Sequence, residues 1–198
     1  MVNFMRKVLI SGVMIFLALS AIPFLTLKAV QTRPNPSDIS TEKTEFTTSD
    51  TAKENTIKSA ADLGEEGFCD EGLKCALVIA KNNLNSDQCK ECTEHKEYPE
   101  EYYRRLERLY DEADLTLQYN EKIVYIPTSS LSKGFTEEDS QYPYIKSVAS
   151  PWDCLDNDFV YDKEYSKGIS MKGLNYLCEN GMNFKEALSW YLPEFSIK

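Results

Sequence analysis

The sequence has fewer basic than acidic residues. Its 198 residues contain 22 Lys and Arg against 32 Asp and Glu, so the formal net charge is −10. Residues 61–198 are more acidic still, with 15 basic and 27 acidic side chains. A field of this sign repels phosphate backbones and anionic polymers. Nucleic-acid binding is therefore disfavoured, and any polymer that the chain binds must be held by hydrogen bonds and aromatic faces.

Histidine is almost absent as well. The single histidine, His95, follows Cys89 and Cys92 in a Cys-x-x-Cys-x-x-His pattern. This spacing resembles half of a zinc site, which would need a fourth ligand such as Cys69 or Cys75. Disulfides in an oxidising compartment, and unpaired or redox thiols, are the competing interpretations of the six cysteines. We expect the cysteines to form disulfides, with the pairing left open. We expect no cofactor, and we expect His95 to be an exposed polar residue.

Long apolar runs are also scarce, since the only one extends from Val8 to Leu27. A helix of that length spans roughly 30 Å, the thickness of a bilayer core. A cleaved signal peptide is the alternative, but the apolar run continues past the small residues Ala18-Leu-Ser20 that would form its cleavage site. We therefore predict a membrane anchor within residues 1–30. Arg6 and Lys7 precede it, which favours a single pass through the cell membrane with the C-terminal domain extracytoplasmic.

The segment that follows the anchor lacks large apolar side chains. Residues 31–60 are rich in Thr, Ser, Glu, Asp and Lys, and such a segment cannot bury enough surface to offset its ordering entropy. We predict a flexible polar tether there. Apolar residues make up 42% of the whole chain and aromatic residues 12%, which is enough for a compact core. Residues 61–198 are predicted to form one folded domain.

Periodic apolar residues and capping signals divide this domain into helices and short strands. Asp70–Leu84 has apolar residues at helical spacing, Pro99 precedes a second helix, Ser170 caps a third, and Asn183 with Glu186 has capping-box spacing before a fourth. Two short runs, 115–119 and 122–126, flank Asn120-Glu121 and are typical of a β-hairpin. The predicted fold is α+β, a small antiparallel sheet with several packed helices, tethered to the N-terminal transmembrane helix.

The segment from Ser130 to Asp153 carries the densest group of candidate binding residues. Ser130, Ser132 and Thr136 offer hydroxyl groups beside the turn-former Gly134, and Glu137 offers a carboxylate. Trp152 has the shape to stack on a sugar ring. The alternative is a turn-rich surface loop in which Trp152 anchors the core.

Three motifs in this order resemble the stage II sporulation protein D family. The first is Ser130-x-Ser-x-Gly-x-Thr-Glu137, and the second is Ser147-Val-x-Ser-Pro-Trp-Asp153. The third, Gly168-x-Ser-x-x-Gly173, keeps the glycines and serine of a family motif. The family consists of membrane-anchored peptidoglycan lytic transglycosylases related to the amidase enhancer proteins. The resemblance implies substrate-binding roles for a set of matching residues. These are Ser130, Ser132, Thr136, Glu137, Trp152 and Ser170.

The residues that move protons in the family are replaced in this chain. The family's catalytic Glu precedes a helix similar to residues 68–81, and the nearest equivalent here is Asp62, which is one methylene shorter. Tyr165 stands where the family has His, and Met171 where it has Gln. A Tyr shuttles protons near neutral pH less readily than a His, and a Met offers only a weak acceptor.

These replacements lead to three hypotheses. The preferred one is an extracytoplasmic peptidoglycan-associated protein with weakened or lost lytic transglycosylase activity, acting in cell-wall remodelling during sporulation. Its partners would be peptidoglycan glycan strands, the membrane through residues 8–27, and a cell-wall hydrolase or septal protein complex. The second hypothesis is an active transglycosylase that acts through Asp62 or another carboxylate. The third is a non-enzymatic partner-binding module on a membrane tether.

Overall fold

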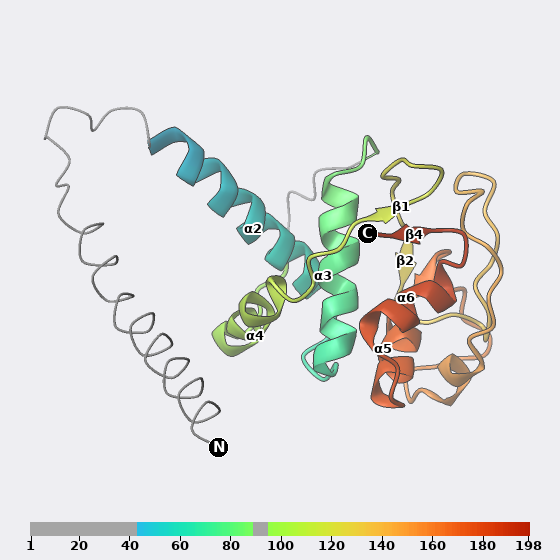
Figure 1. Ribbon diagram of the computed structural model, residues 1–198. Helices are drawn as coiled ribbons and strands as arrows, with labels where there is room; N and C mark the ends of the chain where they lie inside the picture. The colour runs from blue at the N-terminus through green and yellow to red at the C-terminus, as the bar shows by residue number, and fades with distance from the viewer. Residues whose placement is uncertain (1–42, 89–94) are drawn as a thin grey trace, which may run out of the picture. The chain divides into compact units, whose positions relative to one another are not determined.

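The computed structural model describes residues 43–88 and 95–198 (Figure 1). The predicted membrane anchor, residues 8–27, lies outside these ranges. None of the helices in the described part of the chain is long and apolar enough to cross a bilayer. Contacts between Cα atoms divide the chain into residues 1–47 and 48–198, and the fold described below is that of the second unit.

The first described helix, α2 (Lys43–Leu63), corrects the predicted tether. Residues 31–60 were expected to be flexible, but 43–60 are helical and the last turns of the helix are buried. Ile57, Ala60 and Ala61 belong to the hydrophobic core. Their spacing of three and four residues places them on one helical face, so a narrow strip of small apolar side chains is sufficient to dock an otherwise polar helix.

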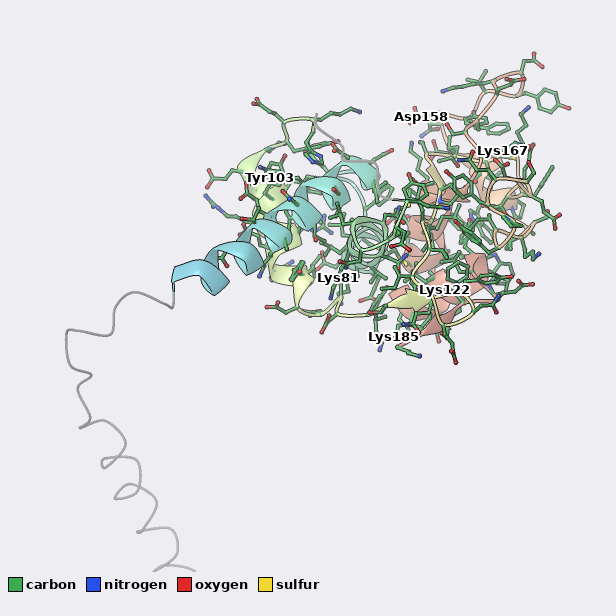
Figure 2. The ribbon with its side chains drawn as sticks, turned by 90° about the horizontal axis from the view of Figure 1, so that it is seen from above. Lys81, Tyr103, Lys122, Asp158, Lys167 and Lys185 are labelled. Atoms are coloured by element: carbon green, nitrogen blue, oxygen red, sulfur yellow. The ribbon has the colours of Figure 1, made fainter. Side chains whose placement is uncertain are left out.

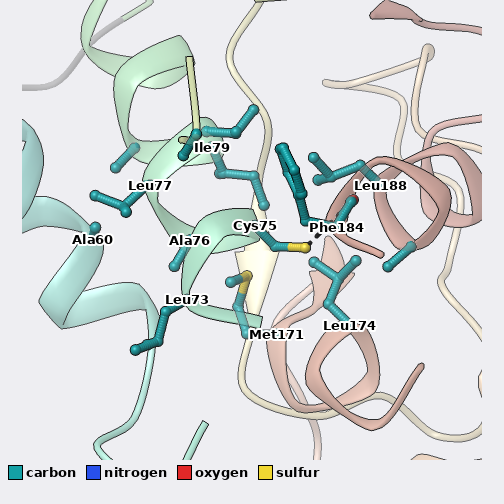
Figure 3. Close-up of a cluster of buried hydrophobic side chains, with 14 of the residues drawn as sticks. Ala60, Leu73, Cys75, Ala76, Leu77, Ile79, Met171, Leu174, Phe184 and Leu188 are labelled. Atoms are coloured by element: carbon teal, nitrogen blue, oxygen red, sulfur yellow. Dashed lines mark hydrogen bonds between the residues drawn. The ribbon is translucent and has the colours of Figure 1, made fainter. Parts of the chain in front are cut away.

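Helix α3 (Asp70–Leu84) is the central element of the fold, and its predicted bounds are confirmed. It packs against α4 (Glu100–Tyr110), α5 (Met171–Glu179) and α6 (Phe184–Tyr191), and its side chains form the middle of the core in Figure 3. Nine of its 15 residues are buried. An element buried on several faces needs apolar side chains all round, which explains the run Cys75-Ala-Leu-Val-Ile-Ala80.

The capping signals of the last two helices are confirmed. The Ser170 hydroxyl accepts a hydrogen bond from the Gly173 N–H at 2.9 Å and begins α5. Asn183 and Glu186 form the predicted capping box of α6. The α6 carboxyl end lies at Tyr191, two residues before Pro193, which cannot continue a helix. Local hydrogen bonding therefore determines where both helices begin.

The strands are short and pair differently from the prediction. β1 (Leu117–Gln118) pairs antiparallel with β4 (Ser196–Ile197), and β2 (Thr128–Ser129) pairs parallel with β3 (Ile169–Ser170). The α+β class is confirmed. The single antiparallel sheet that was predicted is not, because the described strands form two separate two-stranded ladders, one antiparallel and one parallel. A 3-10 helix, η1 (Pro151–Leu155), lies between β2 and β3 in the sequence.

The predicted hairpin is wrong beyond its turn. Tyr119 and Lys122 form a single bridge around Asn120 and Glu121, which have positive φ angles of 48° and 65°. The next residues do not continue the ladder, because side chains of α3 bind their backbone. Asn83 donates to the Ile126 carbonyl at 2.9 Å and accepts from the Ile126 N–H at 2.7 Å. These amide bonds replace the ones that a neighbouring strand would have made.

Candidate functional site

The parallel β2–β3 ladder brings the first and third motifs together. The Ile169 N–H donates to the Pro127 carbonyl at 3.0 Å, and the Lys172 N–H donates to the Ser130 carbonyl at 3.1 Å. Gly168 permits this approach, because its φ is +127° and a Cβ there would overlap the Pro127 carbonyl. Segments about 40 residues apart in the sequence are thus joined through their backbones.

The carboxylate of Asp153, the last residue of the second motif, binds the other two motifs. Its Oδ2 accepts hydrogen bonds from the Ser132 N–H at 2.8 Å and the Ser132 hydroxyl at 2.6 Å. Its Oδ1 accepts from the Ser170 hydroxyl at 3.0 Å. Burial raises the pKa of Asp153, against the hydrogen bonds from Ser132 and Ser170, which lower it. Asp153, Ser132 and Ser170 are all buried, so they hold the loops in place rather than face solvent.

A cleft opens on the other side of the Ser130 loop. Its volume is about 710 Å³, and its walls come from the end of α2, the segment after it, residues 96–98 and the motif loops. The wall of the cleft includes Asp62, Tyr98, Ser130, Ser166 and Met171. The volume falls within the range of roughly 300–1,000 Å³ that is usual for ligand sites. The cleft therefore brings the candidate catalytic residue Asp62 and the first motif into one site.

Asp62 is paired with the only histidine of the chain. Its Oδ2 lies 2.6 Å from His95 Nδ1, and its Oδ1 accepts a hydrogen bond from the Lys96 N–H at 3.2 Å. The two side chains are 25% and 22% exposed, and Asp62 lines the cleft. The expectation that His95 is an exposed polar residue is wrong, because it is half-buried and contacts Asp62, which lies 33 positions earlier in the sequence. A single sequence contains no signal for this pairing.

A second, smaller hollow of about 230 Å³ shares the lining residue Ser166 with the first. Thr136 and Glu137 line it together with Phe135 and Tyr165. The Thr136 hydroxyl is already used, since it donates to the Lys146 carbonyl at 2.7 Å and accepts from the Val148 N–H at 2.7 Å. Glu137 is exposed. Of these two predicted binding residues, Glu137 is the one that presents an available polar group to solvent.

Trp152 lies outside both hollows. Its ring stacks on Tyr176 with a centroid separation of 5.6 Å and an interplanar angle of 6°, and Trp190 lies at 5.9 Å from it. The indole Nε1 donates to the Tyr191 hydroxyl at 3.1 Å. Protein groups therefore occupy one ring face and the N–H, while Trp152 is only partly buried and lines a separate hollow of about 240 Å³ together with Tyr176.

Lys172 neutralises part of the acidic rim of the cleft. Its ammonium lies 2.5 Å from Asp158, 3.2 Å from Asp156 and 3.7 Å from Glu65, and Glu65 lines the cleft. Figure 2 shows Asp158 on the side of the domain that carries Lys167, away from Lys185. Burial lowers the pKa of Lys172, but the bonds to Asp158 and Asp156 outweigh it and raise the pKa. The lysine remains protonated and ties the 156–158 loop to the rim.

The predicted zinc half-site can be described only in part. Cys89 and Cys92 lie outside the described residues, and His95 uses Nδ1 to contact Asp62. Within residues 43–88 and 95–198, no group of three His, Cys, Asp or Glu side chains is arranged to hold a metal ion. The cysteines of these ranges, Cys69, Cys75, Cys154 and Cys178, are free thiols.

Comparison with known proteins adds no relative. No protein-family model matches the chain, and no curated protein is significantly similar to it. The motifs and the geometry of the cleft therefore remain the indications of function.

Proposed function

We propose that this protein is a membrane-anchored, extracytoplasmic peptidoglycan-associated protein that binds glycan strands in its 710 Å³ cleft and acts in cell-wall remodelling during sporulation. The observation that carries the proposal is the meeting of Asp62, Ser130 and Ser166 around one cleft. The membrane attachment through residues 8–27 and the sporulation context derive from the sequence pattern and from the resemblance to the stage II sporulation protein D family. A cell-wall hydrolase or septal protein complex is the partner that this role implies.

The lining of the cleft is suited to a hydroxyl-rich polymer. Ser130 and Ser166 are exposed hydroxyls, each able to donate and accept, and the Tyr98 ring adds an apolar face. Asp62, Glu65 and Glu66 outnumber Lys96 along the cleft wall, and Lys172 offsets Glu65. A saccharide is held there by hydrogen bonds and ring contact rather than by charge.

The same cleft is poorly equipped to cleave a glycosidic bond. Asp62 has both carboxylate oxygens engaged, one by His95 and one by the Lys96 N–H. Tyr165, at the family's His position, accepts from the Val160 N–H at 2.6 Å and stacks on Phe159. Met171 supplies only a weak acceptor to the wall. We infer a protein that holds glycan with weakened or lost transglycosylase activity.

An active transglycosylase is the second candidate, and the Asp62–His95 contact favours it. One carboxylic acid must protonate the glycosidic oxygen and later deprotonate the attacking 6-hydroxyl. His95, at 2.6 Å from Asp62, is placed to hold the carboxyl group in one orientation through both steps. The shorter reach of Asp weighs against efficient catalysis, because a small misplacement lowers the rate steeply.

The test uses the full chain in detergent with purified glycan strands. Co-sedimentation measures binding, and mass spectrometry detects 1,6-anhydro products. Ser130→Trp fills the cleft and is expected to weaken binding by about tenfold or more, equivalent to about 1.4 kcal/mol. Ser140→Trp is the matched control, because Ser140 is exposed and lines neither hollow.

Each outcome selects one candidate. Binding without anhydro products supports the weakened relative. Anhydro products that disappear in Asp62→Asn but persist in Asp87→Asn, an exposed control on the surface, establish the active enzyme instead. If the chain neither binds nor cleaves glycan, both wall hypotheses fail and the partner-binding module replaces them.

A further inference from the structure

Three thiols gather where α3 packs against α5, away from the cleft. Cys69 is the N-cap residue of α3, Cys75 lies within α3, and Cys178 lies near the end of α5. Cys154 lies apart from them, exposed in η1. Figure 3 shows Cys75 in the core between α3 and the α5–α6 pair, where its thiol donates to the Phe184 carbonyl at 3.6 Å.

The two helices approach closely because a glycine lies at their contact. A Cβ at Gly72 would overlap Asn175 Oδ1 and would lie 3.3 Å from the Asn175 Cα. The same amide oxygen accepts a hydrogen bond from the Cys69 N–H at 2.9 Å. Cys75 and Cys178 each follow this contact by three residues, about one helical turn, so each lies on the helical face that meets the other helix.

Cys178 is the thiol that interacts with both of the others. Hydrogen bonds from Cys75 and, more weakly, from Cys69 lower its pKa, although its burial acts in the opposite direction. Burial raises the pKa of Cys75 well above its usual value. Burial also raises the pKa of Cys69, against a hydrogen bond to its sulfur from the Gly72 N–H at 3.4 Å. Cys178 therefore ionises most readily of the three, and the thiolate is the reactive form.

We propose that Cys75 and Cys178 form a disulfide that joins α3 to α5, and that Cys69 is the thiol through which oxidation begins. The order in which the three thiols react follows from their solvent exposure. Cys75 is fully buried and Cys178 is 7% exposed, whereas Cys69 is only partly buried. An external oxidant therefore reaches Cys69 first. The oxidant is an oxidised thiol–disulfide oxidoreductase, which carries a disulfide of its own.

The reaction proceeds by thiol–disulfide exchange. The Cys69 thiolate attacks the oxidant's disulfide, forms a mixed disulfide and releases one oxidant thiol. The Cys178 thiolate then attacks the Cys69 sulfur, which gives a Cys69–Cys178 disulfide and releases the second oxidant thiol. Finally the Cys75 thiolate attacks the Cys178 sulfur, forms the Cys75–Cys178 bond and returns Cys69 to its thiol form. Two thiols lose two electrons and two protons, and the oxidant's disulfide becomes a dithiol.

The sequence makes this pairing easy to test, because trypsin places every cysteine on a separate peptide. Cys69 lies in Ser59–Lys74, Cys75 in Cys75–Lys81 and Cys178 in Gly173–Lys185. The full chain in detergent is incubated with the oxidised oxidoreductase, alkylated in urea and digested without reductant. Mass spectrometry is expected to show the Cys75 peptide joined to the Cys178 peptide. The joined species is lost in Cys178→Ala and retained in Cys154→Ala, which is the matched control.

The opposite results are equally clear. Alkylated, unpaired Cys75 in the oxidised native chain overturns the disulfide, as does Cys75 or Cys178 joined to the peptide of Cys89 or Cys92. The native chain alone decides this point, even if a variant fails to fold. An oxidoreductase that lacks its resolving cysteine should be trapped on Cys69, and trapping on Cys178 instead overturns the proposed route. None of these results bears on glycan binding.

Discussion

Replacement of Gly173 by alanine should destabilise the protein, although it adds a better helix former. Gly173 lies in the first turn of α5, where alanine would ordinarily gain at most about 1 kcal/mol over glycine. Here the new methyl group would overlap the Tyr191 hydroxyl and would lie 2.8 Å from both Asp153 Oδ1 and Ser150 Oγ. We therefore expect the sign of the effect to be reversed.

The size of the destabilisation depends on how firmly the side chains around Gly173 are held in place. Tyr191 is fully buried, and its hydroxyl is bonded to Ser150 Oγ at 2.5 Å and to Trp152 Nε1 at 3.1 Å. Overpacking costs about 1–3 kcal/mol, and breaking one buried hydrogen bond costs about 1–3 kcal/mol more. After the helix gain of at most about 1 kcal/mol is subtracted, the free energy of unfolding should fall by about 1–5 kcal/mol. This corresponds to a Tm lower by roughly 2–20 °C.

Urea unfolding followed by tryptophan fluorescence measures this change at the place where it occurs, because both tryptophans, Trp152 and Trp190, lie beside Tyr191 in space or sequence. Gly67→Ala is the control, since a Cβ there has no neighbour within 4 Å, and it should change stability by less than about 0.5 kcal/mol.

A double variant tests the cause. Tyr191→Phe removes the overlapping oxygen, so its effect combined with Gly173→Ala should be smaller than the sum of the two by more than about 0.5 kcal/mol. A Gly173→Ala protein as stable as the native chain, or strictly additive effects, would refute the reasoning.

Three further predictions concern individual side chains. Because burial raises the pKa of Asp153 above its unfolded value of about 3.9, its stabilising contribution is complete below that pH and is lost as the pH rises through the folded pKa. The stability difference between the native chain and Asp153→Asn, from urea titrations at several pH values, should therefore grow toward acid pH; growth toward neutral pH would contradict this. Asn183→Ala removes the capping-box acceptor of α6 and should cost about 1 kcal/mol by thermal unfolding, with no effect expected from Ser189→Ala beyond about 0.5 kcal/mol. Asn83→Ala leaves both backbone groups of Ile126 without their partner, so the cost should be about 2–3 kcal/mol and the Ile126 amide should exchange its hydrogen faster.

The helices that the sequence predicted correctly are those with local signals. Asp70–Leu84 has a long apolar pattern, and the start of α6 at Asn183 depends on residues three positions apart. Helix α2 was missed because its buried face contains small residues among many polar ones, although Ile57, Ala60 and Ala61 have helical spacing. A prediction that gave more weight to this spacing than to the polar composition would have placed a helix there.

The strand partners and the site geometry depend on contacts between distant residues. The Leu117 strand pairs with the chain terminus, and the expected hairpin partner is bound by α3 side chains instead. Hydroxyls predicted to face a ligand, such as those of Ser132 and Ser170, point instead to a buried carboxylate. Residue type indicates that a group can form hydrogen bonds, but only the fold determines whether its partner is a ligand or another part of the protein.

The docking of α2 determines where the folded domain can be cut. A fragment that begins at Ala61, the boundary suggested by composition, would lose Ile57 and Ala60 from the core and would leave Asp62 on a frayed chain end. The Asp62 carboxylate would then lack the helix that holds it against His95. Limited proteolysis of the full chain should accordingly spare the peptide bonds between Thr56 and Leu63, and soluble fragments that keep the cleft intact should begin no later than Thr48.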